Sequence, residues 1–174
     1  ITLLFLTSCL PSGQGTESTP EPIPPTAPDQ FNFESGLVPA YQHIVQEMDD
    51  ASLYSIKFVI DDDLYHITGS EEVTYTNRET VDLNEIHLRL FANILGGEMI
   101  VQNTKVNGND VTPNYSLNNS LLIIPLGTPL APTERITLSM DFSITVPQMV
   151  QQNYSVQAYY ENVLALGHAY PMIA

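Results

Sequence analysis

Residues 136–146 read ITLSMDFSITV, and this segment decides the fold class. Every second residue is apolar, and the residues between them are Ser or Thr, apart from Asp141. A period of two over this length is typical of a β-strand with one buried face. The hydroxyl-bearing face opposite predicts an antiparallel sheet with one side in water.

Further segments with the same period lie on both sides of this one, at 54–60, 65–67, 73–75 and 86–90. Asp62-Asp63 stands between the first two as a turn. Asn107-Gly108 is a strong hairpin signal, because both residues tolerate positive φ, and 121–124 is a short, fully apolar strand. Residues 53–174 are therefore predicted to form an all-β domain, an antiparallel saddle-like double sheet or sandwich.

One short helix is expected before the sheet, over 38–52. Pro39 fits the first helical turn. The apolar residues Tyr41, Ile44, Val45 and Met48 fall on one face at helical spacing. Asp49 and Asp50 oppose the helix dipole at the C-terminal end.

The segment 10–37 has the composition of a disordered tether. Six prolines lie between Pro11 and Pro28, with Ser, Thr, Gly and Glu between them. Such a segment buries little apolar surface and favours extended polyproline geometry. A polyproline ligand for the aromatic groove of a partner is an alternative reading.

The chain of 174 residues is strongly acidic, with 20 Asp and Glu against 5 Lys and Arg, a formal net charge of −15. Seven acids precede Ala51, and the first basic residue is Lys57, so nearly half of the charge precedes the sheet. The acidity argues against nucleic acid as a partner, and against electrostatic docking on an anionic membrane, because both need a basic face.

The only cysteine, Cys9, follows the apolar run 1–6 and the small residues Thr7 and Ser8. This pattern resembles the lipobox of bacterial lipoproteins. Residues 1–9 are then a truncated signal segment, cleavage falls between Ser8 and Cys9, and Cys9 carries the lipid. The expected location is extracytoplasmic, at the cell surface or in the periplasm, with the membrane as a partner through the lipid. A buried structural cysteine, or a chance match to the pattern, is the alternative.

No catalytic or metal-binding set is apparent within the chain. None of the four histidines, His43, His66, His87 and His168, is paired at i, i+4, and there is no HExxH. Asp61-Asp62-Asp63 offers oxygen ligands for calcium, although a solvated hairpin tip is the simpler reading. The tyrosines Tyr154, Tyr159, Tyr160 and Tyr170 suit a sugar or peptide surface, or else the edge of the core and an interface. Metal binding in this chain is not expected.

A series of segments resembles the N-terminal β-domain of aminopeptidase N-like zinc metallopeptidases (gluzincins). The matching features are a strand of the type Tyr-x-Ile-x-Phe-x-Ile-Asp, a strand ending in Asn, a strand ending in Phe and followed by Ala-Asn, a Val-Asn-Gly hairpin, a Leu-x-Pro-x-x-x-Ile strand, and a Val-Pro pair. They occupy, in order, residues 54–61, 67–77, 83–93, 106–108, 130–136 and 146–147. The last segment, 164–174, resembles the passage into the catalytic domain, where the family carries an aromatic-Pro pair, here Tyr170-Pro171.

The resemblance implies a fragment of a longer enzyme. The zinc-binding HExxH, the distal Glu and the loop that binds the substrate amine would lie beyond Ala174, so zinc is implied for the catalytic domain and no cofactor for this fragment. The implied partners are that catalytic domain and a peptide substrate. Glu161 is the nearest acid to the passage, but the local match is too poor to assign it the amine. The alternative is a non-enzymatic surface lipoprotein that binds a ligand or another protein.

Overall fold

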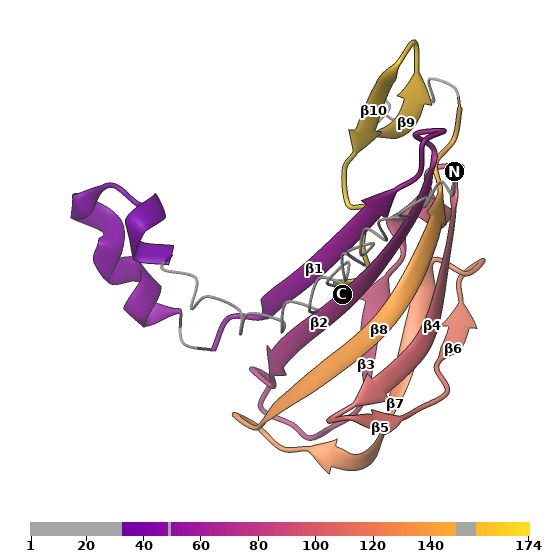
Figure 1. Ribbon diagram of the computed structural model, residues 1–174. Helices are drawn as coiled ribbons and strands as arrows, with labels where there is room; N and C mark the ends of the chain where they lie inside the picture. The colour runs from indigo at the N-terminus through magenta and orange to yellow at the C-terminus, as the bar shows by residue number, and fades with distance from the viewer. Residues whose placement is uncertain (1–32, 49, 149–155) are drawn as a thin grey trace, which may run out of the picture. The chain divides into compact units, whose positions relative to one another are not determined.

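The computed structural model describes residues 33–48, 50–148 and 156–174. Two compact units divide the chain, one at 1–45 and the other at 46–174 (Figure 1). The predicted sites at Ser8 and Cys9 and most of the predicted tether lie outside the described residues.

Two short 3₁₀-helices precede the sheets, η1 (Phe33–Gly36) and η2 (Pro39–Glu47). The first falls within the range expected to be the tether. The second begins at Pro39 as expected, but it is a 3₁₀-helix and ends at Glu47. Its expected apolar face is not buried, since Tyr41 is 57% and Met48 is 54% exposed. A short helix gains most of its stability from packing, and this one buries none of its residues.

The regular elements in the rest of the described chain are almost all strands. In chain order these are β1 (Leu53–Ile60), β2 (His66–Thr76), β3 (Leu83–Arg89), β4 (Glu98–Val106), β5 (Asn109–Asp110), β6 (Asn114–Ser116), β7 (Leu121–Leu130), β8 (Arg135–Thr145), β9 (Gln157–Tyr160), β10 (Val163–Leu166) and β11 (Met172–Ile173), with one short 3₁₀-helix, η3 (Phe91–Asn93), after β3.

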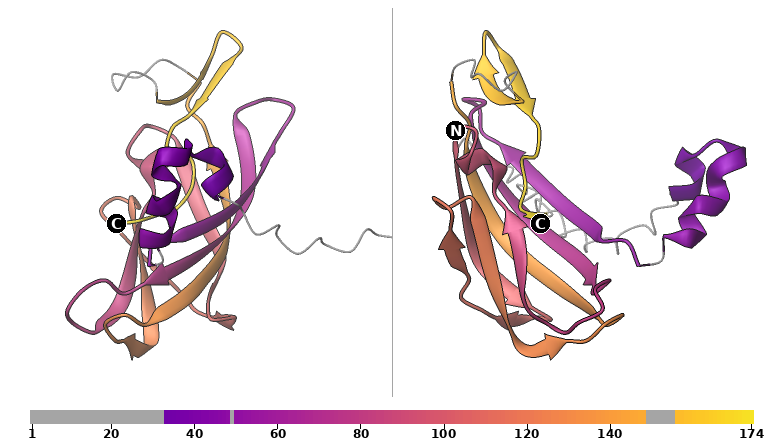
Figure 2. Two further views of the ribbon diagram at one scale, coloured as in Figure 1. Left: turned by 90° about the vertical axis from the view of Figure 1, so that its left-hand side faces the viewer. Right: turned by 180° about the vertical axis from the view of Figure 1, so that it is seen from behind.

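The strands form two larger sheets and one hairpin, and every pairing is antiparallel. One sheet has the order β1-β2-β8-β4-β5, the other has β11-β3-β7-β6, and β9 pairs with β10. The long strands β1, β2 and β8 curve along their length, which is clear from two further directions (Figure 2). The predicted all-β, antiparallel double sheet is confirmed.

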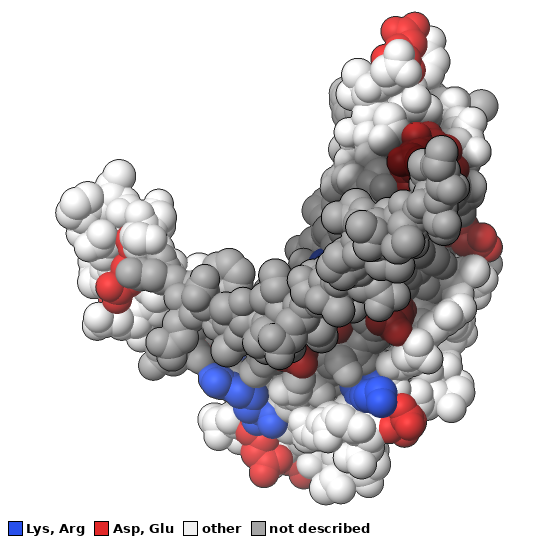
Figure 3. Space-filling view, viewed as in Figure 1, with Lys and Arg blue, Asp and Glu red and all other residues white. Residues whose placement is uncertain are grey.

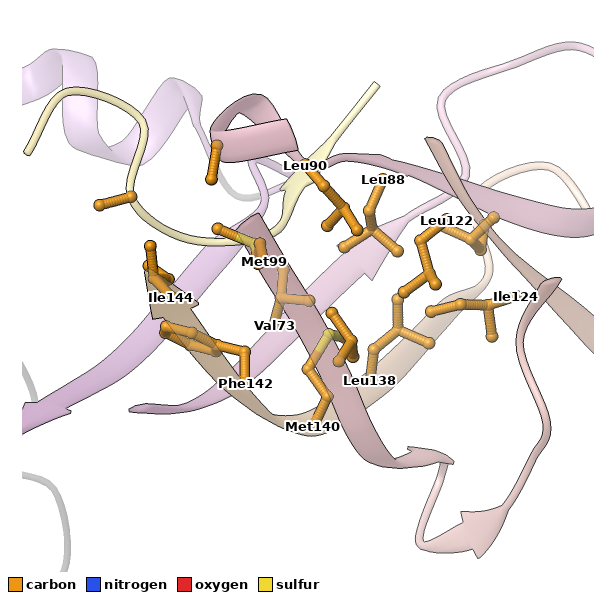
Figure 4. Close-up of a cluster of buried hydrophobic side chains, with 14 of the residues drawn as sticks. Val73, Leu88, Leu90, Met99, Leu122, Ile124, Leu138, Met140, Phe142 and Ile144 are labelled. Carbon is orange, nitrogen blue, oxygen red and sulfur yellow. The ribbon is translucent and has the colours of Figure 1, made fainter. Parts of the chain in front are cut away.

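The core lies between the two larger sheets (Figure 4). Residues 136–146 comprise most of β8 and the residue that follows it, and their six apolar side chains are all buried, each at most 6% exposed. Val73 and Met140 of one sheet point toward Leu88, Leu122 and Ile124 of the other. The polar residues of β8 face away from this core, so the two-residue period predicted its orientation correctly.

The predicted turns are also present. Asn107 and Gly108 both have positive φ, 49° and 80°, and join β4 to β5 as a tight hairpin. The link from β1 to β2 contains Asp61–Leu64, where the Asp63 carboxylate accepts hydrogen bonds from the backbone N–H groups of Tyr65 and His66. Asp63 therefore has a structural role in the turn. Within the described residues, no helix is long and apolar enough to cross a membrane.

Candidate functional site

The C-terminal segment 167–174 joins the two larger sheets. In one sheet its strand β11 pairs with β3, placing Met172 opposite Arg89 and Ile173 opposite Leu88. The backbone N–H of Ala174 also donates to the carbonyl of His87. The segment therefore completes the edge of the four-stranded sheet.

The same segment is bound to the five-stranded sheet through Tyr54 on β1. The backbone N–H of Ile173 donates to the Tyr54 hydroxyl oxygen at 3.1 Å. The ring of Tyr54 meets the ring of Tyr170 edge to face, with centroids 5.6 Å apart. One tyrosine thus contacts the segment through both its ring and its hydroxyl.

Glu71 on β2 lies on the core side of the same sheet. It is 2% exposed, and neither carboxyl oxygen has a hydrogen-bond partner among the described residues. Its direct neighbours across the strands are Ile56 and Met140. Burial raises the pKa of Glu71 to about 8, because an apolar surrounding disfavours the charged form. The carboxyl group is therefore mostly protonated at neutral pH.

Tyr54 also has a raised pKa. Burial of the phenol is the main cause, and the negative charges of Glu71 and Tyr170 act in the same direction, while the hydrogen bond from Ile173 opposes them. Tyr54 therefore stays neutral under ordinary conditions. The charge of Glu71 thus acts on the Tyr54 hydroxyl, although burial is the main cause of the raised pKa of Tyr54.

A second group of aromatic residues surrounds the hairpin β9–β10. Tyr65 stacks on Tyr159 with centroids 6.4 Å apart, and the Tyr159 hydroxyl donates to the Asn162 carboxamide oxygen at 3.2 Å. Tyr159 and Tyr170 pack against the core, whereas Tyr160 is exposed. Of the four tyrosines singled out in the sequence, two therefore fit the core-edge reading, and Tyr154 lies outside the described residues.

Glu161 occupies the tip of this hairpin. Glu161 and Asn162 both have positive φ, 48° and 65°, as a two-residue hairpin turn requires. The Glu161 side chain is exposed and makes no hydrogen bond or ion pair that would orient it within the described part of the chain. Its position gives no reason to assign it a ligand.

The histidines are distributed over separate parts of the fold. His66 Nδ1 lies 2.7 Å from an Asp63 oxygen, and His87 Nε2 lies 2.7 Å from a Glu85 oxygen. The third, His168, packs on Phe91 with ring centroids 4.7 Å apart. The described residues contain no group of three His, Cys, Asp or Glu side chains that could hold a metal ion. These residues do not fit a zinc site.

The outer face of the five-stranded sheet carries a shallow groove of about 370 Å³, which is lined by both polar and apolar residues. Lys57, Ser70 and Asn103 contribute to it, and the Asn103 amide donates to Asp141 at 2.7 Å. On the described part of the face in Figure 3, Lys and Arg form small separate groups with acidic side chains beside them. The groove therefore combines a Lys, an Asp and hydroxyl-bearing side chains with apolar residues.

Sequence reasoning missed Glu71 and the hydroxyl of Tyr54. The alternation along β2 could have identified Glu71. Successive residues of a strand face opposite sides, so Glu71 lies on the same side as the buried residues Ile67 and Val73. The role of Tyr54 depends on a contact with Ile173, which lies far away in the sequence, and no local pattern reveals such a contact.

The two sheets and the bridging C-terminal segment define the class of this chain as an antiparallel all-β domain. No protein-family model matches the sequence, and no curated protein matches it.

Among solved structures, the chain is similar to the M1 zinc metallopeptidase from Deinococcus radiodurans, with 24% identity over 55% of this chain and 20% of that one, and a TM-score of 0.45. It is also similar to a mutant two-domain M1 zinc metallopeptidase bound to L-arginine, with 23% identity over 57% of this chain and 21% of that one, and a TM-score of 0.46. The chain thus spans about a fifth of the length of these structures. Similarity at these sequence identities and TM-scores supports no conclusion about function.

Proposed function

We propose that this chain is the N-terminal scaffold domain of an extracytoplasmic zinc metallopeptidase, most simply an aminopeptidase. The support is the agreement between the motif series and the fold. The segments 54–61, 67–77 and 83–93 coincide with β1, β2 and β3 with η3. The Val-Asn-Gly motif forms the β4–β5 turn, and the segment 164–174 covers β10, β11 and the stretch between them.

One observation carries the proposal furthest, namely the attachment of the C-terminal segment to both sheets. A domain that follows Ala174 in the chain would be joined to the scaffold through Tyr54, β3 and β11. This attachment would set where the next domain begins. The scaffold would then border an active site whose catalytic residues and zinc belong to the following domain, with a peptide as substrate.

We further propose that the domain is held at a membrane by a lipid on Cys9. The support is the lipobox-like sequence at residues 6–9 and the proline-rich segment that follows it. Acyl chains contribute ~0.8 kcal/mol per buried CH₂, so more than one chain gives stable anchoring. The acidic residues before the sheet would keep the domain away from an anionic surface.

Sequencing the gene beyond the codon for Ala174 tests the peptidase role. An HExxH motif followed by a distal Glu is the expected result, because two His and a Glu hold the zinc while the motif Glu acts as general base. The full-length protein should then contain zinc and hydrolyse aminoacyl anilides, and a chelator should abolish this activity. A stop codon soon after Ala174 would contradict the role and favour a non-enzymatic surface lipoprotein.

A further inference from the structure

We propose that Glu71 and Tyr54 form a proton-controlled latch for the C-terminal segment, which stays bound to β1 while the Glu71 carboxyl group carries its proton and is released when that proton is lost. The inference goes beyond the proposed function and does not depend on it, because every residue of the latch lies in this chain.

The position of Glu71 gives the latch its sensor. The side chain points to the core side of β2, with Ile56 on one neighbouring strand and Met140 on the other. Its two oxygens have no hydrogen-bond partner in the described part of the chain. A neutral carboxyl group tolerates this site at moderate cost, whereas a carboxylate without a partner is strongly disfavoured there. Ionisation therefore favours any rearrangement that brings water to Glu71.

Tyr54 gives the latch its contact with the segment. Tyr54 and Glu71 are on the same face of the β1–β2 pair, because Glu71 is opposite Ile56 and Tyr54 is two residues before Ile56. Diagonal neighbours of this kind are within reach of an aromatic side chain. Through its hydroxyl and its ring, Tyr54 contacts Ile173 and Tyr170. Movement of the segment away from Tyr54 would uncover this diagonal neighbour of Glu71 and so would admit water to the Glu71 carboxyl group.

Few other charged groups act on Glu71 and Tyr54. Besides Glu71, the titratable groups here are Tyr54 from β1 and Tyr170 from the C-terminal segment. The core side of β8 contributes Met140, which is apolar. On β3, which binds the far side of the segment, His87 is paired with Glu85, and its backbone carbonyl accepts the N–H of Ala174. His87 is therefore a further ionisable residue bound to the segment, and it needs a control variant of its own.

The direction of the effect follows from the protonation of the two states. In the bound state Glu71 holds its proton up to about pH 8. In a released, hydrated state it would lose the proton near the ordinary value for Glu. Between these two pH values the released form binds fewer protons, so rising pH favours release, by up to about tenfold per pH unit. Above the upper value both forms are ionised, and the effect becomes constant.

Hydrogen exchange at the Ile173 amide tests the latch in the full chain. Exchange is measured by NMR between pH 5 and 9 and corrected for the intrinsic rate, while the Glu71 carboxyl is followed through its ¹³C shift. In the native chain, protection of Ile173 should fall as pH rises and level off near pH 8, where the carboxyl titrates. Glu71→Gln, which cannot ionise, should remove this dependence.

Three further variants complete the test. The matched control Glu72→Gln changes an exposed acid on the same strand and should behave as the native chain does, as should His87→Gln. Tyr54→Phe should leave Ile173 poorly protected at every pH. The latch is ruled out if Glu71→Gln keeps the native pH dependence, or if the Glu71 carboxyl of the native chain titrates near the ordinary value for Glu. The titration of the Glu71 carboxyl is measured on the native chain, so this test does not depend on whether a variant folds.

Discussion

The hydroxyl oxygen of Tyr54 accepts a hydrogen bond from the backbone N–H of Ile173 at 3.1 Å, and 119 positions separate the two residues in the sequence. Tyr54 belongs to the first strand of the domain and Ile173 to the last. The bond connects the edge strand of one sheet to the edge strand of the other. The two edges are thereby held together at the point where the described chain ends.

Replacement of Tyr54 by Phe removes only this hydroxyl and keeps the ring contact with Tyr170. The expected loss of unfolding free energy is about 1 kcal/mol, the usual net value of one hydrogen bond. Urea denaturation followed by tyrosine fluorescence measures it. The same change at Tyr41, which is 57% exposed on η2, should have no effect. Equal losses in the two variants would show that the bond contributes nothing.

Replacement of Glu71 by Leu should raise the stability of the domain at alkaline pH. The native pKa is raised to about 8, so below the ordinary Glu pKa both folded and unfolded chains are protonated. From there to about pH 8 only the unfolded chain has lost the proton, and stability falls with rising pH by roughly 3–5 kcal/mol in total. Glu71→Leu should show no such fall.

The comparison for Glu71→Leu is the exposed neighbour, changed as Glu72→Leu. The Glu72 side chain is in water on the opposite face of the sheet. The free energy of unfolding of Glu72→Leu should therefore keep the native dependence on pH. Denaturant titrations at pH 5, 7 and 9 measure the free energy of unfolding of the native chain and of the two variants. A native chain that is as stable at pH 9 as at pH 5 would contradict a raised pKa at Glu71.

The period-two pattern predicted the fold because burial in a two-layer sheet is decided locally. The alternation of 136–146 reappears residue by residue in β8, and Asn107-Gly108 forms the tight turn that its tolerance of positive φ predicts. The type of η2 was not predictable in this way. Helical spacing places Tyr41 and Met48 on one face, but only packing against that face would stabilise an α-helix, and both residues are exposed.

The candidate site was less predictable, since it depends on contacts between distant segments. Tyr54 was recognised only as a member of the first strand. Tyr170 was recognised as one of four tyrosines that suit a ligand surface or the edge of the core, and through the family resemblance of its segment. Glu71 sits in a run of polar residues, Ser-Glu-Glu, that reads as solvated. The strand register alone shows that one of these two glutamates faces the core. The lipid predicted on Cys9 stays a prediction.

Asn77 should be among the most sensitive polar residues of the domain. It is 1% exposed, and its amide nitrogen donates to the carbonyls of Leu130 at 2.8 Å and Val81 at 2.9 Å, while its side-chain oxygen accepts the N–H of Glu79. Asn77→Ala leaves these buried groups unpaired and should cost about 2–4 kcal/mol, measured by urea denaturation. Asn84→Ala, at an exposed position of β3, should cost little. Similar costs at both positions would contradict this role.

Gly69 should not tolerate alanine, because β2 passes close to two neighbours there. A Cβ atom at this position would meet the ring of Phe142, with its Cε2 at 2.7 Å, and the backbone oxygen of Lys57 at 2.8 Å. Overpacking of this kind costs about 1–3 kcal/mol. Gly127→Ala on β7 is the matched control, since no atom lies within 4 Å of its Cβ. A Gly69→Ala variant with native thermal stability would show that the contact relaxes freely.

Cys9→Ser tests the proposed anchor in cells that express the chain with its complete leader. Radiolabelled palmitate should be incorporated into the native protein and absent from Cys9→Ser, because the hydroxyl of Ser does not replace the thiol that receives the diacylglycerol. Without acyl chains, the protein should also move from the membrane to the soluble fraction. Ser8→Ala keeps a small residue at the predicted cleavage site and should be labelled normally. Equal labelling of Cys9→Ser and the native protein would exclude Cys9 as the lipidated residue, whatever the outcome for the peptidase role.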